Sequence, residues 1–509
     1  MIRFPMRAAF VRNAAPRARV LGAALVLLGA TQFAAHAQPP AKSAAAPAST
    51  LDRNIQPTPG AAPVLRVPKW TRTVLSNGAE LIVSEKHELP LVAVNIAFVG
   101  GAANFEPSDK VGVAGFTAQL LSEGTASKTG DQLSDAQQLL GTTIGATIGL
   151  ESGSIRFTAL KEKLDPALAL VAEMLLTPSF PNDAIERQRA RRLVNLAQSK
   201  DQPNTIASNV FLKVLYGDLH PYGRVVMKEQ EVRGITRDDV IAFHKAYFRP
   251  GRAVITVTGD VTAAAAKASV EKALARWTAG GDRPSFSYPA PPPSVSRTIY
   301  LVDKPKAAQS VFALGVTGPN RQSADYYAIE VMNNILGVLF QSRLNHNIRE
   351  VKGYSYGVFS NFAYGRGPGA FRAGGGIVSA KSDSALIEFM KELRGVQGGV
   401  PFTDDEIKQG KESLTMGLAS RFSSVNATGG SIGSIYTQGL SETLFQDYAR
   451  NINAVTSADL VRVARKYVDV DHLNIVIVGD RATIEAPLRA TGIAPIVLLN
   501  VDGKPVVTP

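Results

Sequence analysis

The 509-residue chain lacks cysteine and has only six histidines. Without cysteine it can form no disulfide, no thiolate zinc site, no cysteine nucleophile and no acylated cysteine behind an export signal. The histidines are His36, His87, His220, His244, His346 and His472. They show neither H-x-x-x-H nor H-x-H spacing, so we interpret each as an ordinary surface or core residue. The sequence therefore predicts no zinc and no other cofactor in this chain.

Long apolar runs are also lacking, apart from one near the N-terminus at Val20 to Ala30. Five arginines and no acidic residue precede this run, and Ala35-His36-Ala37 follows it as a small-x-small cleavage site. We predict a signal peptide over residues 1–37, export to the periplasm of a Gram-negative bacterium, and no integral membrane span. The alternative is an uncleaved anchor, although the run is shorter than the roughly 20 residues that a bilayer core requires.

Acidic residues are fewer than basic ones, and the formal net charge is +12. Five of these charges belong to arginines of the signal peptide, which leaves +7 on the exported chain. The other basic residues are scattered between acids, and the densest run is RQRARR, Arg187 to Arg192. We interpret this run as the solvated face of a helix, and we do not expect nucleic acid as a partner.

Segments rich in proline, alanine and glycine divide the chain. Residues 38–63 have no periodic apolar face and are interpreted as a flexible leader, and residues 278–294 as a linker. The domains predicted on either side of the linker are residues 64–277 and 295–509.

These two domains contain matching segments. Ile235 to Asp260 align without a gap with Val455 to Asp480, and Ser179 to Gln188 align with Pro401 to Gly410, at offsets of 220 and 222 residues. Each copy of the first segment has the pattern of a threonine-capped helix followed by a buried strand. The sequence thus predicts two tandem, homologous α+β domains, each a largely antiparallel sheet with helices packed on it.

The stretch GVAGFTAQLLSEGT, Gly112 to Thr125, has the pattern of a helix, but its central positions carry no side chain that could hold a metal. Its apolar stripe, Val113, Phe116, Leu120 and Leu121, is expected to pack on a sheet. Together with LVAVNIAFVGGAANFEP before it, SRLNHNIREVKGYSYG later and the duplication, this stretch resembles the insulinase/pitrilysin family of zinc peptidases, whose motif is H-x-x-E-H. The resemblance implies that the two domains form a half-shell.

In that family two histidines hold zinc, and the glutamate beside the second is the base for a zinc-bound water. The resemblance places the two histidines at Gly115 and Gln119, the base at Ala118, and a third ligand, a glutamate, at Asn195. Glycine and alanine have no donor atom, and neutral glutamine is a poor zinc ligand. All four positions are therefore degenerate.

The resemblance also implies roles for Arg349 and Tyr356, which match an arginine near a helix end and a tyrosine on the following strand. Gly353 between them supplies the helix stop. Such a pair would donate hydrogen bonds to the oxyanion that forms on a scissile peptide. The alternative is that Arg349 only caps a helix and Tyr356 only fills a sheet face. Tyr354, expected on the same strand face as Tyr356, is a candidate substrate-binding residue.

A long glycine-rich substrate loop, which some family members carry, is missing. The corresponding segment, NNILGVLFQSRL, has the single glycine Gly337, so recognition of that kind is not expected. Gly374-Gly375-Gly376, after the strand GAFRA, are interpreted as a turn or a bulge.

Some family members form pairs in which one subunit keeps the zinc and the other keeps the arginine and the tyrosine. We expect this chain to be of the second kind, inactive alone and completing the site of a zinc-bearing partner with an intact H-x-x-E-H. Its substrates would be unfolded peptides, held partly by strand addition along an edge strand around Val94 to Gly100. The alternative is a non-enzymatic structural or peptide-binding member of the family.

Overall fold

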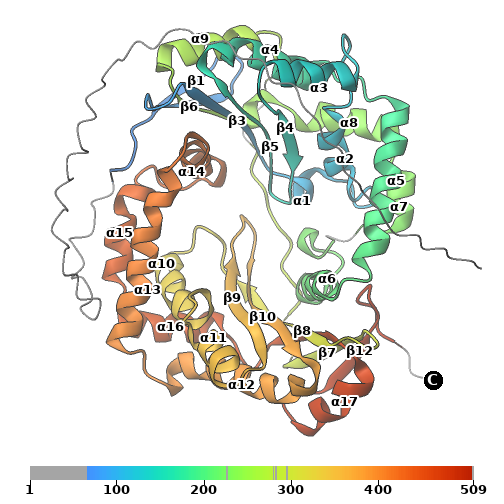
Figure 1. Ribbon diagram of the computed structural model, residues 1–509, viewed down its shortest axis with the longest axis vertical. Helices are drawn as coiled ribbons and strands as arrows, with labels where there is room; N and C mark the ends of the chain where they lie inside the picture. Colours follow the sequence, from blue (N-terminus) through green and yellow to red (C-terminus); the bar gives the residue numbers. More distant parts are fainter. Residues whose placement is uncertain (1–65, 225–226, 279, 281–283, 294–295, 507–509) are drawn as a thin grey trace, which may run out of the picture. The chain divides into compact units, whose positions relative to one another are not determined.

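The fold is described from a computed structural model that covers residues 66–224, 227–278, 280, 284–293 and 296–506. The predicted signal peptide, the leader and parts of the linker lie outside the described residues. Two six-stranded sheets with helices packed on them form the rest, and each sheet comes from one of the two predicted domains (Figure 1). The prediction of an α+β fold is confirmed.

The strand order is β1-β2-β6-β3-β5-β4 in the N-terminal sheet and β12-β7-β11-β8-β10-β9 in the C-terminal sheet. The N-terminal strands are β1 (Thr71–Val74), β2 (Glu80–Glu85), β3 (Leu91–Val99), β4 (Gly145–Ile148), β5 (Ser152–Leu160) and β6 (Ala253–Gly259). The C-terminal strands are β7 (Thr298–Asp303), β8 (Gln309–Gly318), β9 (Ser355–Ala363), β10 (Gly369–Val378), β11 (Asn474–Gly479) and β12 (Ile496–Leu499). Only β2·β6, β7·β11 and β7·β12 pair in parallel, so both described sheets are largely antiparallel.

The helices of the N-terminal domain are α1 (Ala102–Phe105), α2 (Val113–Leu120), α3 (Gly130–Leu139), α4 (Leu164–Leu176), α5 (Asn182–Ser199), α6 (Pro203–Tyr216), α7 (Glu229–Gly234), α8 (Arg237–Tyr247) and α9 (Ala263–Ala273). Those of the C-terminal domain are α10 (Tyr326–Asn333), α11 (Arg343–Asn345), α12 (Ser382–Arg394), α13 (Asp404–Gly417), α14 (Val425–Gln438), α15 (Leu444–Ala454), α16 (Ser457–Tyr467) and α17 (Arg481–Ala490). Two π-helices, η4 (Asn334–Val338) and η5 (His346–Val351), flank α11.

The structure confirms the internal repeat. The first matched segment forms α8 and β6 in one domain and α16 and β11 in the other. Thr236 and Thr456 cap the two helices, and each backbone N–H donates in return to the aspartate three residues on. Such a capping box satisfies two otherwise unpaired N–H groups, which explains why both copies start their helix at the same aligned residue.

The two domains exchange a helix. Helix α14 of the C-terminal domain packs on β3 and β6 of the N-terminal sheet. Its glycines allow a close approach, because a Cβ atom at Gly433 would lie 2.9 Å from the hydroxyl oxygen of Thr256 and one at Gly429 would lie 3.0 Å from that of Thr258. Strand β6 is therefore buried on both faces along its whole length.

Helix α6 makes the reciprocal contact from the N-terminal domain, packing on β8 and β11 of the C-terminal sheet. Its buried side chains include Val210 and Phe211, which share a core cluster with Val476 and Val478 of β11. Figure 1 shows each exchanged helix beside the sheet of the other domain. The two sheets thus share their hydrophobic cores, and each domain supplies one layer of the other.

The prediction of an edge strand around Val94 to Gly100 is wrong. Strand β3 lies inside the sheet, paired with β6 on one side and β5 on the other. Its almost unbroken apolar sequence suits a strand with both faces covered. The edge at this end of the sheet is β4, which pairs with β5.

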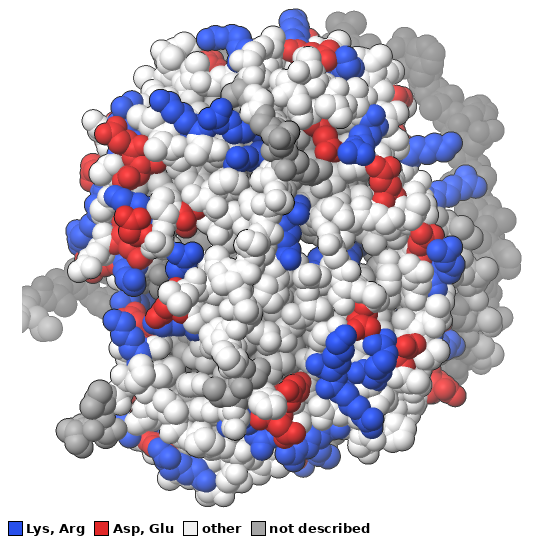
Figure 2. Space-filling view, turned by 180° about the vertical axis from the view of Figure 1, so that it is seen from behind, with Lys and Arg blue, Asp and Glu red and all other residues white. Residues whose placement is uncertain are grey.

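Among the residues that the structure describes, no helix combines the length and apolar character that crossing a bilayer requires. On the face shown in Figure 2, lysine and arginine side chains are interspersed with aspartate and glutamate. This face therefore presents no broad field of one sign, of the kind that binds a nucleic acid backbone.

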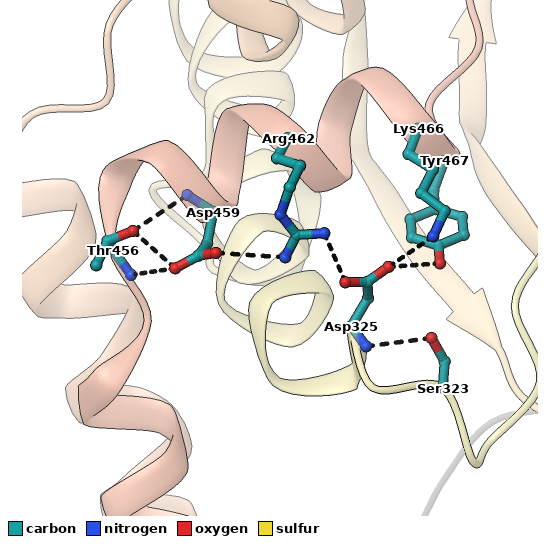
Figure 3. A network of polar contacts seen from close by, with 7 residues as sticks. All are labelled: Ser323, Asp325, Thr456, Asp459, Arg462, Lys466 and Tyr467. Atoms are coloured by element: carbon teal, nitrogen blue, oxygen red, sulfur yellow. Dashed lines mark hydrogen bonds and ion pairs between the residues drawn. The ribbon is translucent and has the colours of Figure 1, made fainter.

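Asp325 joins the start of α10 to the repeat helix α16 (Figure 3). Its carboxylate accepts hydrogen bonds from Arg462 at 2.6 Å, Lys466 at 2.9 Å and the Tyr467 hydroxyl at 2.7 Å. Burial alone would raise its pKa, but these three donors outweigh burial and lower the pKa to about 2. Because the side chain is only 13% exposed, this network is partly shielded from solvent.

We expect Asp325→Asn to lower the free energy of unfolding by about 1 to 2 kcal/mol at pH 7. The folded-state pKa lies below the ordinary aspartate value of 3.8, so the contribution is full above about pH 4 and disappears as the pH falls toward 2. Urea unfolding from pH 7 down to pH 2.5 measures it, with Asp109→Asn, an exposed loop carboxylate, as control. A difference between Asp325→Asn and wild type that stays constant over this range would contradict the assignment.

Candidate functional site

Helix α2 forms where the sequence predicted it, between residues 112 and 125, although its helical part ends at Leu120. Gly112 precedes it with a φ of 98°, a conformation that favours glycine. The Glu106 carboxylate caps the first turn by accepting from the backbone N–H of Gly112 at 3.0 Å and of Ala114 at 2.8 Å. The predicted apolar stripe, Val113, Phe116, Leu120 and Leu121, is fully buried.

The four degenerate positions come together where α2 packs against α5. Ala118, Gln119 and Asn195 line one pocket of about 750 Å³, and Gly115 lies one helical turn before Gln119. The positions named from the family resemblance thus lie together, and their correspondence to zinc ligands stays a prediction. Every residue that lines the pocket comes from the N-terminal domain, between Ala118 and Met227.

The guanidinium of Arg192 lies over these positions. One of its terminal nitrogens donates to the side-chain oxygen of Gln119 at 3.3 Å. A Cβ atom built on Gly115 would lie 2.9 Å from the same nitrogen, so the guanidinium fills space beside the bare glycine. Its central carbon also lies 4.4 Å from the ring centre of Phe116, close enough for a cation–π contact. A cation thus lies beside two of the positions where the family resemblance puts zinc ligands.

Burial shifts the pKa values of the two ionisable groups at this site, Arg192 and Glu106, in opposite directions. Burial lowers the pKa of Arg192, and the nearby Glu106 carboxylate opposes this change. Burial likewise raises the pKa of Glu106, against its two backbone hydrogen bonds and the charge of Arg192. Arginine stays protonated at any physiological pH, so the site carries a permanent positive charge.

The interpretation of RQRARR as a solvated face is wrong for two of its four arginines. Arg187 and Arg191 are exposed and pair with Glu123. Arg189, in contrast, donates to the backbone oxygens of Val232, Arg233 and Ile235, and Arg192 turns into the pocket. Arg192 precedes Asn195 by three residues, and this helical spacing was the signal that could have placed it at the site.

The described part of the chain shows neither a histidine-containing metal site nor a serine in the setting of a catalytic nucleophile. No group of three histidine, aspartate or glutamate side chains there could hold a metal ion. His244 bonds the backbone oxygen of Leu175 at 2.8 Å, and His220 stacks on Tyr216. Ser431 has G-x-S-x-G spelling around it but lies inside α14, whereas a nucleophile elbow needs a strand-to-helix turn.

Arg349 lies in the π-helix η5 of the C-terminal domain. Its guanidinium pairs with Glu350 at 3.0 Å and stacks on the ring of Phe340 at 4.6 Å, and its side chain remains 37% exposed. Gly353 ends the turn as predicted, with a φ of 67° and an N–H that donates to the Arg349 carbonyl oxygen. π-Helical turns occur frequently at functional sites.

Tyr356 lies on the edge strand β9 and is 87% exposed. The pairing of β9 with β10 shifts between Gly375 and Ile377, so Tyr356 and Gly357 together face Gly376 in a β-bulge. The interpretation of Gly374 to Gly376 as a turn or bulge is met only in part, because β10 continues through these glycines and the bulged residues are on β9, opposite Gly376. A bulge re-aims side chains, and this one leaves the Tyr356 hydroxyl open to solvent.

Tyr354 does not share the surface of Tyr356. It precedes β9, packs against the C-terminal core, and has the ammonium group of Lys381 5.8 Å from its ring centre. Simple strand alternation fails here because Tyr354 lies outside the strand and the bulge follows directly. Its substrate-binding role stays a prediction.

The surface around Arg349 and Tyr356 was missed by the sequence reasoning. Several exposed apolar side chains surround the pair along the chain: Val338, Phe340, Val351 and Phe359. Apolar side chains gathered on a surface commonly mark a binding site.

Comparisons with known proteins agree with this architecture. The family description "Insulinase (Peptidase family M16)" matches residues 81–225, and "Peptidase M16 inactive domain" matches residues 234–414. An uncharacterized zinc protease of Mycobacterium leprae is 27% identical over 353 residues, which cover 68% of this chain and 78% of that protein. The uncharacterized zinc protease YmxG of Bacillus subtilis is 23% identical over 357 residues, covering 70% and 85%.

Solved structures show the same fold. A crystal structure described as a peptidase M16 inactive domain from Pseudomonas fluorescens superposes with a TM-score of 0.75 at 25% identity, covering 81% of this chain and 98% of that one. A protease from Helicobacter pylori gives a TM-score of 0.72 at 20% identity, with 81% and 99% covered.

We expect that restoring the four ligand and base side chains does not restore zinc while Arg192 is present. A dication about 4 Å from the guanidinium would be repelled by about 8 kcal/mol at an effective dielectric constant of about 20. The test compares two variants by zinc analysis of the purified protein. The first carries Gly115→His, Ala118→Glu, Gln119→His and Asn195→Glu, and the second adds Arg192→Ala. Only the second should approach one zinc per chain, and full occupancy in the first would refute the role given to Arg192.

Proposed function

Because the chain belongs to the insulinase family of peptidases, peptidase family M16, we propose that it is a catalytically incomplete subunit of a periplasmic zinc peptidase. It pairs with a family member that bears zinc and the base, and it supplies Arg349 and Tyr356 to that partner's site. The observation that carries this proposal is the guanidinium of Arg192 over Gly115 and Gln119, where a metal would have to bind.

The exposure of Arg349 and Tyr356 supports a role in contacts with another molecule, because neither side chain is used only for packing within this chain. Tyr356 fills no sheet face, since most of its side chain is in solvent, and this disfavours the purely structural alternative. Arg349 is held by Phe340 and Glu350 but keeps N–H groups that can donate. A fixed guanidinium and a phenol are suitable donors to a developing oxyanion, and removing one such donor typically costs about a hundredfold to a thousandfold in kcat.

The reaction class that we propose, peptide hydrolysis, follows from the names of the relatives. The M. leprae and B. subtilis proteins are called zinc proteases, so peptide hydrolysis is the chemistry to which this chain would contribute. Peptide substrates in extended conformation could add to the edge strand β4, next to the pocket. A non-enzymatic, peptide-binding member is the second candidate, and the pocket beside β4 favours it over a purely structural role.

The test mixes this chain with a zinc-bearing family member from the same organism and measures cleavage of an unfolded peptide. Arg349→Ala and Tyr356→Phe should each lower the kcat of the mixture by about a hundredfold or more. Arg450→Ala, an exposed arginine on α15, and Tyr327→Phe, a partly buried tyrosine, are the matched controls and should leave it unchanged.

Each subunit alone should cleave far more slowly than the mixture. If the mixture keeps full activity with both Arg349→Ala and Tyr356→Phe, the catalytic role of this chain is wrong and the non-enzymatic function is favoured. Cleavage by this chain alone, with zinc bound in equal amount, would overturn the proposal altogether.

A further inference from the structure

We propose that the pocket at the former zinc position is a binding site for a peptide carboxylate, with Arg192 as the group that recognises it. This inference does not depend on the proposed function, because it concerns binding to this chain alone. The ligand class is a short peptide that offers a carboxylate in extended conformation.

The first observation is that the guanidinium of Arg192 has more hydrogen-bond donors than partners among the described residues. An arginine side chain has five N–H donors, and within the described residues Arg192 has two partners, the Gln119 oxygen at 3.3 Å and the sulfur of Met227 at 3.6 Å. Its Nε atom is buried and has no hydrogen-bond partner there. Leaving donors of a buried charged group unpaired is costly, and a carboxylate can satisfy two of them at once.

The second observation is the charge around the pocket. Its charged lining residues are Glu123, Arg191 and Arg192. Glu123 is already engaged by Arg187 at 2.9 Å, Gln188 at 3.2 Å and Arg191 at 3.5 Å. Glu106 interacts with Arg192 electrostatically, without a hydrogen bond between them. Its carboxylate accepts its two described hydrogen bonds from backbone N–H groups at the start of α2. The lining is therefore positive overall and can attract an anion.

The third observation favours a peptide over a small anion. The pocket holds about 750 Å³, far more than one carboxylate needs, and falls within the range of sites that enclose organic ligands. Gly145 and Ala146 of the edge strand β4 form one side of it. A strand edge offers backbone hydrogen bonds to an extended chain, while the amide of Asn195 and the hydroxyl of Ser199 add polar groups opposite.

The experiment titrates this chain alone with three N-acetylated octapeptides of one Ala/Ser/Val sequence, using calorimetry at low salt. The first has a free C-terminal carboxylate, the second a C-terminal amide, and the third an amide together with one internal glutamate. The carboxylate-bearing peptides should bind at least tenfold more tightly than the uncharged amide. The stronger of the two identifies the source of the carboxylate, which is either the chain end or an acidic side chain.

Variants then assign the effect to Arg192. Arg192→Leu should abolish the advantage of the carboxylate, whereas Arg233→Leu, which changes an exposed arginine on α7 that does not line the pocket, should change affinity by less than threefold. Circular dichroism and thermal unfolding check that each variant folds. The comparison of free acid with amide in the wild-type chain needs no variant, so the proposal stays testable even if Arg192→Leu misfolds.

Equal binding of free acid and amide to wild type would overturn the proposal. So would an unchanged carboxylate preference in folded Arg192→Leu, or inorganic phosphate that competes as strongly as the peptides. None of these outcomes bears on Arg349 and Tyr356, whose test measures cleavage by the mixture.

Discussion

The exchange of α6 and α14 is the contact on which the rest of the structure depends. The central strands of each sheet, such as β6, β8 and β11, are buried on both faces, and a helix of the other domain covers one of these faces. The second cover comes from the other domain, through glycines on α14 and bulky apolar side chains on α6. Burial of this kind is the dominant stabilising contribution in folded proteins, so neither domain can be removed without stripping a core. Helix α2 packs in the N-terminal core, and the bulge at Tyr356 lies in a strand of the C-terminal sheet.

Where the family resemblance places zinc ligands, this chain carries the guanidinium of Arg192 beside Gly115 and Gln119. The apolar stripe of α2 still packs on the sheet, and Glu106 still caps its first turn. The helix thus has a structural role, and the pocket beside it holds one fixed cation whose Nε has no hydrogen-bond partner among the described residues. In the C-terminal domain, Arg349 and Tyr356 are exposed through local backbone irregularities, a π-helix and a bulge.

The family resemblance pointed to the positions that meet at the pocket, while local sequence signals predicted the fold class, the repeat and the capped helices. They did so because a threonine cap, a glycine stop and an apolar stripe act over a few residues. Three features depended on distant partners and were missed. The apolar residues of β3 did not reveal which strands flank it, those of α6 and α14 did not reveal which sheet they cover, and the glycines of β10 did not reveal that the bulge itself is on β9, at Tyr356. The orientation of Arg192 could have been predicted, since it lies one helical turn before Asn195.

The helix exchange also has a consequence for synthesis. The outward hydroxyls of β6, Thr256 and Thr258, stay uncovered until the ribosome has produced α14, which ends at Gln438. A nascent N-terminal domain therefore cannot complete the packing of this face before α14 has been synthesised. Such a delay suits the export that we propose, because a polypeptide threaded through a translocation channel must not have folded beforehand.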